Sequence, residues 1–241
     1  MSIILVTDLH LRDPEGSTDA AHHTARIGAY LDQAAEAFPD AVCCVLAGDL
    51  ADAGEVAAYG WLKRKLDTLP LPSIPMLGNH DDRDAFHRVF HPGDSSGGFI
   101  QSTQEFGGFR LVFLDTHEPG TDSGLLCNAR LDWLDRRLAE GGDVCLFMHH
   151  PPCDIGDPIL DPLKLSNSDD LATLLQRHGN VRQVFFGHVH RTMILTWNGI
   201  PCASLGSLGA EAGTRLPGHG PVLGLLTPDH EGLALTVRPL P

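Results

Sequence analysis

The stretch Ile3-Ile4-Leu5-Val6-Thr7-Asp8-Leu9-His10 opens the chain with a short apolar run that ends in polar side chains. Continuous apolar runs of this length are typical of strands buried on both faces of a sheet. Similar runs recur at residues 41–46, 74–77, 111–114, 144–148, 184–186, 193–197, 223–226 and 233–237. The sequence therefore predicts a core built largely of strands.

Helical patterns separate the early apolar runs. One apolar helix face is formed by Ile27, Tyr30, Leu31, Ala34, Ala35 and Phe38, and Ser17 or Thr18 is expected to cap its start. Further helices are expected over residues 56–69, 129–138 and 169–177. This alternation is typical of a layered α/β domain with helices outside. From residue 182 onward, strands and turns without helical pattern predict an antiparallel continuation that completes a second sheet.

Composition and charge exclude several classes of protein. The 241 residues, 42% hydrophobic and 20% charged, are typical of a globular protein, which we expect to form a single domain over 1–241. With 17 basic against 31 acidic residues, the net charge of −14 makes nucleic acid an unfavourable partner. No apolar run reaches the length of a membrane span, and residues 3–6 are too short for a secretory signal. We therefore expect a cytoplasmic protein.

Polar side chains follow five of the predicted strands, at the point where each strand ends. They are Asp8 and His10, then Gly48-Asp49, Gly78-Asn79-His80-Asp81, His149-His150, and Gly187-His188-Val189-His190. Ligands of α/β sheets bind at the carboxyl ends of the strands, and parallel strands bring those ends together. The sequence thus predicts a cluster of oxygen and imidazole donors at one edge.

The donor types in this cluster indicate metal ions. Asp, Asn and His suit Mn, Fe, Zn or Co better than metals that prefer thiolates. The candidate ligands number seven: Asp8, His10, Asp49, Asn79, His149, His188 and His190. Seven side chains exceed the need of one ion and fit two ions about 3.5–4 Å apart that share a carboxylate. If the segments 8–10 and 188–190 are extended, residues two apart point the same way.

These motifs resemble the calcineurin-like metallophosphoesterase superfamily, whose pattern is D-x-H, G-D, G-N-H-D/E, a histidine after a strand, and G-H-x-H. Residues 8 to 190 carry every element in this order. Residues 78–83, 114–116 and 149–152 look most like bacterial class III cyclic nucleotide phosphodiesterases and glycerophosphodiesterases. The resemblance implies an α/β fold, a four-layered αββα sandwich of two mixed sheets flanked by helices.

The resemblance also implies roles for single residues. Asp8, His10, Asp49 and His190 would bind one metal ion, Asp49, Asn79, His149 and His188 the other, and Asp49 would bridge them. His80 would be the catalytic residue that contacts the phosphoryl group, with Asn79 beside it, and His117 could line the substrate entrance. The implied reaction is in-line attack of metal-bound hydroxide on a small phosphodiester.

Two other functions stay open on the sequence alone. A phosphomonoesterase or a nucleotide pyrophosphatase would use the same ligands, and a scaffold without catalysis would keep the fold. The scaffold is disfavoured because all the motif positions are filled. A monomer and a homo-oligomer are both compatible with the sequence, and we expect no membrane partner.

Overall fold

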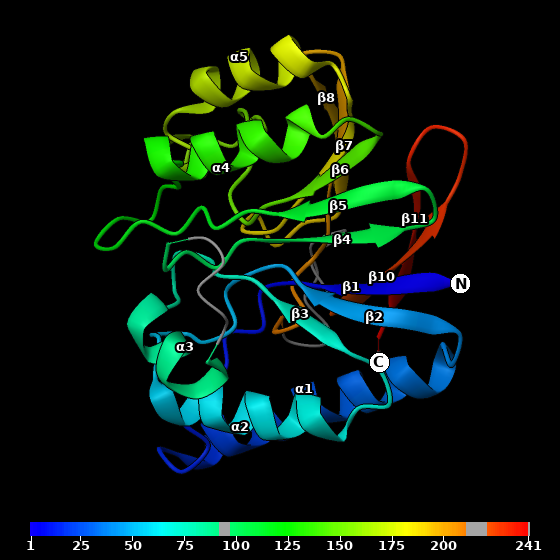
Figure 1. Ribbon diagram of the computed structural model, residues 1–241. Coiled ribbons are helices and arrows are strands. Elements are labelled where there is room, and N and C mark those ends of the chain that lie inside the picture. The colour runs from blue at the N-terminus through cyan, green and yellow to red at the C-terminus, as the bar shows by residue number, and fades with distance from the viewer. Residues whose placement is uncertain (92–96, 211–220, 241) are drawn as a thin grey trace.

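The computed structural model describes residues 1–91, 97–210 and 221–240. Two mixed β-sheets lie face to face, and helices cover the outer side of each sheet (Figure 1). This four-layered αββα sandwich confirms the predicted fold class. Among the described residues, no helix has the length and apolar character needed to cross a bilayer.

The first sheet has the strand order β11-β10-β1-β2-β3. Its parallel centre consists of β1 (Ser2–Val6), β2 (Ala41–Leu46) and β3 (Ser73–Pro75). On the other side of β1, the antiparallel pair is β10 (Val222–Pro228) and β11 (Leu233–Pro239). The helices of this side are α1 (Thr18–Ala37), α2 (Val56–Thr68) and α3 (Arg83–Phe90). Ser17 caps α1 by accepting a hydrogen bond from the amide of Ala20.

The second sheet has the order β4-β5-β6-β7-β9-β8. Its strands are β4 (Ser102–Phe106), β5 (Phe109–Phe113), β6 (Val144–Phe147), β7 (Val181–Phe186), β8 (Met193–Trp197) and β9 (Ile200–Ser204). Strands β5, β6, β7 and β9 run parallel, and the edge strands β4 and β8 run antiparallel to their neighbours. The outer face carries α4 (Asn128–Ala139) and α5 (Ser168–His178), and a short 3-10 helix (Asp161–Leu163) precedes α5.

Along each central strand, successive side chains point to opposite faces of the sheet, and both faces are buried. In β1, Ile3 and Leu5 pack between the two sheets, whereas Ile4 and Val6 pack against α1 and α2. In β5, Phe113 faces the other sheet and Val112 faces α4 and α5. The short apolar runs of the sequence therefore reflect strands that are covered on both sides.

Two expectations about the chain path were wrong. The segment from residue 182 onward does not complete a single second sheet: β8 and β9 join it, but β10 and β11 return to the first sheet, where Leu226 pairs with Ile3. β9 also runs parallel to β7 rather than antiparallel. The second concerns residues 84–108, whose glycines predict the least regular region of the chain. This segment includes most of α3 and all of β4.

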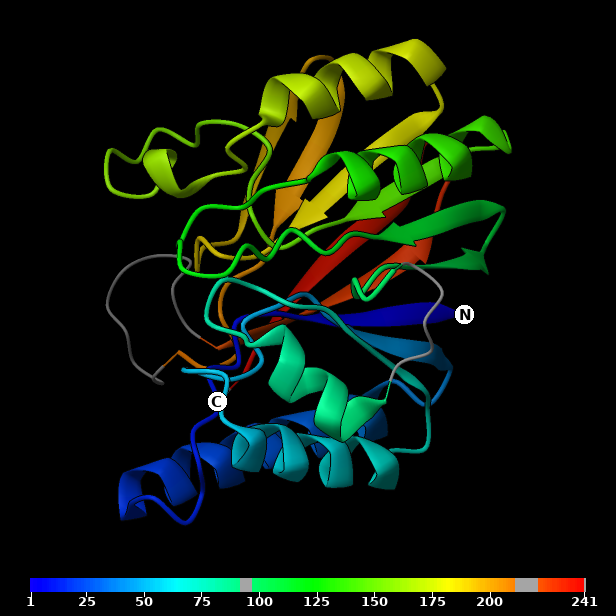
Figure 2. The ribbon, with the colours of Figure 1, turned by 60° about the vertical axis from the view of Figure 1, so that its left-hand side comes forward.

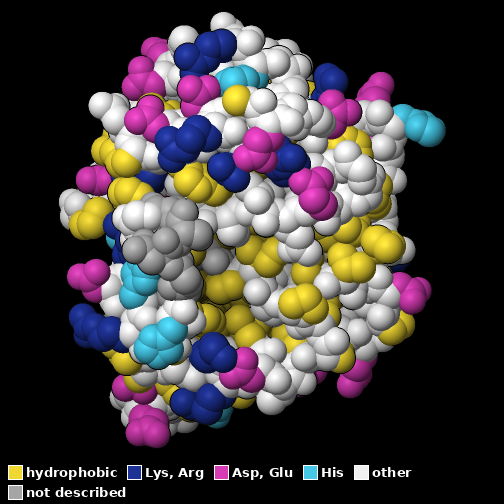
Figure 3. Space-filling model, in the orientation of Figure 1, with side chains coloured by type: hydrophobic (Ala, Val, Ile, Leu, Met, Phe, Trp, Pro, Cys, Tyr) yellow, Lys and Arg dark blue, Asp and Glu magenta, His cyan; other side chains and the backbone are white. Residues whose placement is uncertain are grey.

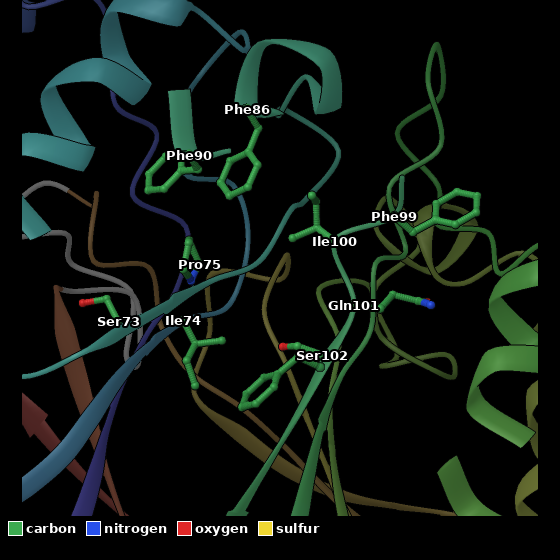
Figure 4. A pocket seen from close by; sticks show the side chains of 10 residues that line it. Ser73, Ile74, Pro75, Phe86, Phe90, Phe99, Ile100, Gln101 and Ser102 are labelled. Atoms are coloured by element: carbon green, nitrogen blue, oxygen red, sulfur yellow. The ribbon is translucent and has the colours of Figure 1, made fainter. Parts of the chain in front are cut away.

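An apolar cavity of about 350 Å³ lies at the seam where the edge strand β3 approaches β4. Phe86 and Phe90 of α3 lie on one side of it, with Pro75 and Ile100 close by (Figure 4). The space-filling view shows a hollowed apolar area on this face of the molecule (Figure 3). The cavity lining includes none of the predicted ligands, so the candidate chemistry lies elsewhere.

Candidate metal centre

The predicted ligands follow strand ends that gather at one end of the two sheets. Asp8 follows β1, Asp49 follows β2 and Asn79 follows β3, while His149 and His188 follow β6 and β7. Figure 2 shows the loops after these strands collected on the same side of the molecule. Segments up to 180 residues apart therefore meet, as in the contact of His10 with His190.

The first group of donors comprises Asp8, His10, Asp49 and His190, whose ligand atoms all lie within 4.8 Å of one another. His10 Nε2 lies 3.0 Å from His190 Nε2 and 3.6 Å from Asp49 Oδ2. His190 Nε2 lies 3.4 Å from Asp8 Oδ1. Two imidazoles and two carboxylates crowded in this way form a mixed nitrogen and oxygen site.

The second group comprises Asp49, His149 and His188, again with ligand atoms within 4.8 Å. Asn79 joins it, because its Oδ1 lies 3.2 Å from His149 Nε2 and 2.9 Å from His188 Nδ1. Asp49 Oδ2 lies 3.3 Å from His149 Nε2, so one carboxylate belongs to both groups. The structure brings all seven predicted side chains together, in the division that the resemblance implies.

The backbone at these ligands is left-handed, not extended. Asp8, His10, Asp49, His188 and His190 have φ angles of 55°, 47°, 49°, 68° and 52°. The segments 8–10 and 188–190 are therefore not extended as expected, although Asp8 and His10 do join the same donor group. Left-handed turns send His188 to one donor group and His190 to the other. Strained backbone of this kind clusters at functional sites and persists when the surroundings enforce it.

Two motif glycines are required because the donors approach the backbone closely. A Cβ atom on Gly78 would clash with Asp49 Oδ1 and lie 2.6 Å from His149 Nε2. A Cβ atom on Gly187 would clash with Thr7 Oγ1 and lie 3.1 Å from Asp8 Oδ2. Any larger residue at either position would displace candidate ligands.

Hydrogen bonds outside the cluster orient its members. Thr7 Oγ1 donates to Asp8 Oδ2 at 2.7 Å, and the amide of His188 donates to Asp8 Oδ1 at 3.1 Å. His149 Nδ1 donates to the carbonyl of Ala47 at 2.9 Å. Because that carbonyl can only accept, Nδ1 keeps its proton, and Nε2 is the atom that His149 turns toward Asp49 and Asn79.

The electrostatics of the cluster favour positive charge. Burial would raise the pKa of Asp49, but the imidazoles of His149 and His10 hold it well below its usual range. Burial would lower the pKa of His149, yet Asp49 and Asp8 raise it to about 9. Buried carboxylates and imidazole lone pairs that face a common space fit a pair of metal cations, which would replace protons at these positions. The chain therefore carries a candidate site for two metal ions.

His80 lies at the edge of the cluster. Its side chain is 41% exposed, and its ring meets that of His10 edge-on, with 4.7 Å between the ring centres. Its amide donates to Asp49 Oδ1 at 3.0 Å, and its Nδ1 donates to the carbonyl of Asp52 at 2.8 Å. The structure thus places His80 beside the donors and open to an incoming molecule.

Asp81 supports the site in a way that the sequence interpretation missed. From the sequence alone, Asp81 and Asp82 suggest a helix start with Arg83 as their partner. In the structure only Asp82 caps α3, accepting from the amide of Ala85 at 2.7 Å. Asp81 is buried and accepts hydrogen bonds from the amides of Leu50, Ala51 and Gly78 and from the Tyr59 hydroxyl, all within 3.1 Å. It ties the loop of Asp49 to that of Asn79.

His117 lies next to the cluster rather than in it. Its side chain is buried, and it lines a hollow of about 270 Å³ together with Asn79 and Arg83. Its carbonyl accepts hydrogen bonds from Arg83 and Arg130 at 2.7 and 2.8 Å. Contact of His117 with a substrate stays a prediction. The sequence also suggests residues 204–221 as a wall of the substrate pocket, and of these 211–220 lie outside the described residues.

Comparison with known proteins gives relatives over most of the chain. Residues 1–192 match the Calcineurin-like phosphoesterase family. The chain is 36% identical over 208 residues to a probable cyclic nucleotide phosphodiesterase from Rhodopseudomonas palustris, covering 83% of this chain and 76% of the relative. It is 28% identical over 216 residues to the glycerophosphodiester phosphodiesterase GpdQ from Enterobacter lignolyticus, covering 85% and 76%.

A solved structure agrees at the level of the fold. A dimetal phosphatase from Danio rerio superposes with a TM-score of 0.73 and 17% identity, over 99% of this chain and 96% of that one. The family match spans well over half of the sequence and includes every candidate ligand. The chain belongs to the calcineurin-like phosphoesterase family.

Proposed function

We propose that this chain is a metal-dependent phosphodiesterase that hydrolyses small phosphodiesters of the cyclic nucleotide or glycerophosphodiester type. The names of the two relatives support this substrate class. The observation that carries the proposal is the pair of donor groups that share Asp49, with His80 at their edge. We also propose that residues 1–241 act as one domain in the cytoplasm.

The proposed ligands are Asp8, His10, Asp49 and His190 for one ion and Asp49, Asn79, His149 and His188 for the other. When bound, two ions of Mn, Fe, Zn or Co would supply Lewis acidity and ionise water near neutral pH. The residues of the chain hold and orient the diester. Asn79 and His80 are adjacent at the cluster, where both can reach the phosphoryl group, and His117 lines the neighbouring hollow.

His80 is the proposed proton donor to the leaving alcohol. Its Nδ1 proton is held by the carbonyl of Asp52, which leaves Nε2 to face the substrate. In the imidazolium form, the Nε2–H can protonate the departing alkoxide oxygen as the ester bond breaks. Neutral His80 then remains, and solvent restores its proton.

A panel of substrates at matched Mn²⁺ loading tests the proposed function. It compares bis(p-nitrophenyl) phosphate, 3′,5′- and 2′,3′-cyclic nucleotides, glycerophosphodiesters and p-nitrophenyl phosphate. We expect turnover of diesters that a chelator abolishes and added Mn²⁺ restores. Turnover of the monoester alone would make the chain a phosphomonoesterase. Metal binding without turnover of any substrate would identify a scaffold.

The substitution His80→Ala tests the role of the proton donor. We expect kcat to fall roughly 100-fold for an alkyl diester such as glycerophosphoethanolamine, because a poor leaving group needs a proton. Bis(p-nitrophenyl) phosphate should lose much less, since p-nitrophenolate leaves without protonation. Metal content, measured by elemental analysis, should stay unchanged.

The matched control for this substitution is His230→Ala, which removes an exposed histidine at the turn between β10 and β11. It should leave both substrates unaffected. An equal loss for the two substrates in His80→Ala would assign His80 to phosphoryl contact alone. Full activity on both would remove it from the reaction.

A further inference from the structure

A basic hollow of about 460 Å³ lies at the N-terminal end of α1. It is lined by Arg12, Asp19, His22, His23 and Arg26, and we call it the α1 hollow. Figure 2 shows this end of the helix, in dark blue, projecting beyond α2 on the side where the strand-end loops gather. Two arginines and two histidines in one hollow are unexpected in a chain of net charge −14.

Among the described residues, no carboxylate pairs with the arginines of the α1 hollow. Arg26 Nη2 donates to His23 Nδ1 at 3.1 Å and to the carbonyl of Gly209 at 3.0 Å, and its Nε is buried without a partner. Neither Arg12 nor Arg26 forms an ion pair within the described parts of the chain. Arg83 and Arg191, by contrast, each pair with an aspartate at 2.8 and 3.1 Å.

The balance of charge in the α1 hollow favours an anion. Among the described residues that line the hollow, two carry a guanidinium group and one, Asp19, carries a carboxylate, which is exposed in the first turn of α1. The N-terminal end of a helix adds partial positive charge. Arginine binds phosphate oxygens through paired, charge-assisted hydrogen bonds, and a phosphate dianion would neutralise both guanidinium groups.

The α1 hollow adjoins the loops that carry the candidate metal ligands. Leu9 is the residue between the candidate ligands Asp8 and His10, and its carbonyl accepts a hydrogen bond from His23 Nε2 at 2.8 Å. Gly209, whose carbonyl Arg26 binds, donates its amide to the carbonyl of Asp8 at 2.9 Å. Arg12 is two residues beyond His10, so their Cα atoms are at most about 7 Å apart. The α1 hollow and the candidate metal ligands therefore share the loop of residues 8–12.

We propose that the α1 hollow binds a terminal phosphate carried by the diester that reacts at the metal cluster. The preferred substrates would then be phosphodiesters with a second, monoester phosphate. This inference rests on the proposed function and narrows its substrate class to nucleotide or glycerol diesters that carry a second phosphate. Arg12 and His22 would contact the terminal phosphate, while Arg26 and His23 also hold the loops of Gly209 and Leu9 in place.

A matched pair of chromogenic diesters tests the inference on the Mn²⁺-loaded full chain. Thymidine 5′-(p-nitrophenyl phosphate) lacks a terminal phosphate, and its 3′-phosphorylated form carries one. We expect kcat/KM to be at least about tenfold higher for the 3′-phosphorylated form, as a charge-assisted contact would give. Arg12→Gln should bring the ratio of the two close to one. Arg64→Gln, an exposed arginine of α2, is the control and should retain the ratio.

A binding measurement separates this inference from the proposed function. On the Zn²⁺-loaded full chain, titration with inorganic phosphate should shift the His22 ring resonance saturably in NMR spectra. Arg12→Gln should remove the shift, and Arg64→Gln should retain it. No shift, or the same shift in both variants, would overturn the anion site.

The kinetic outcomes distinguish a failure of this inference from a failure of the proposed function. Hydrolysis of both diesters with equal kcat/KM in the wild type would overturn the inference and leave the proposed function standing. A phosphate shift at His22 combined with equal kcat/KM would mean that the α1 hollow holds free phosphate, which overturns its assignment to the substrate. Hydrolysis of neither thymidine diester by a chain that hydrolyses bis(p-nitrophenyl) phosphate would overturn the inference alone. Hydrolysis of no diester in either set would overturn the proposed function, and the inference with it.

Discussion

Asp49→Asn is expected to lower kcat/KM for bis(p-nitrophenyl) phosphate by at least about 1,000-fold, because it removes the carboxylate common to both donor groups. Asparagine keeps the size of the side chain and loses its charge. Asp49 Oδ2 lies between His149 Nε2 at 3.3 Å and His10 Nε2 at 3.6 Å, where an amide nitrogen cannot serve as a ligand. Metal content should therefore fall below one ion per chain.

The measurement combines steady-state kinetics with elemental analysis of dialysed protein. Asp67→Asn is the matched control. Asp67 is an exposed aspartate of α2 that pairs with Lys63, whereas Asp49 is buried. It should keep full activity and metal content. If Asp49→Asn retained two ions and normal turnover, the shared-carboxylate assignment would be wrong.

The site could be predicted from the sequence to the extent that it depends on strand ends. Asp8 and Asn79 directly follow apolar runs, and in a layered sandwich those positions meet at one end of the sheets. The residue types then indicate metal ions without knowledge of any distance. The same reasoning located His149 and His188, because β6 and β7 are buried on both faces and read as continuous apolar runs.

The conformation of the ligand loops could not be predicted in this way. Left-handed φ angles at Asp8 and His190 arise where surrounding contacts enforce them, and neither residue type carries that signal in sequence. The pairing of β10 with β1 could not be predicted either. The apolar pattern of a strand does not say to which of two sheets the strand is added. A helix start was expected at Asp81 and Asp82, but the extent of α3 was not, because an eight-residue helix shows barely two turns of periodicity.

The ion-pair partner of Arg83 could not be predicted from its neighbours in the sequence either. Its neighbours Asp81 and Asp82 suggested a local ion pair, but Arg83 instead binds Asp115, which is 32 residues away. Asp81 is occupied by backbone amides and Asp82 by the start of α3. Asp81 and Asp82 therefore have few lone pairs free, and Arg83 pairs with a carboxylate from another part of the chain.

Asp115→Ala is expected to lower the free energy of unfolding by about 3–5 kcal/mol, since it breaks a buried ion pair from one side. Asp115 is fully buried, and its oxygens accept two hydrogen bonds from Arg83 and one each from the amides of Ile100 and His117. Arg130, also buried, lies 3.8 Å away. Without the carboxylate, Arg83 loses its anion and Arg130 keeps only the partly exposed Glu118, at 2.9 Å.

Urea unfolding provides the measurement, as a lower midpoint with an unchanged slope. Asp143→Ala is the control, because the ion pair of Asp143 with Arg182 is as short, at 2.8 Å, but both side chains are nearly half exposed. Its loss should stay below about 1 kcal/mol, since water replaces the partner of an exposed charge. Equal losses in the two variants would show that burial does not set the strength of the Arg83–Asp115 contact. A large loss in Asp115→Ala alone would show that this contact, which joins the start of α3 to the end of β5, stabilises the wall of the hollow beside Asn79.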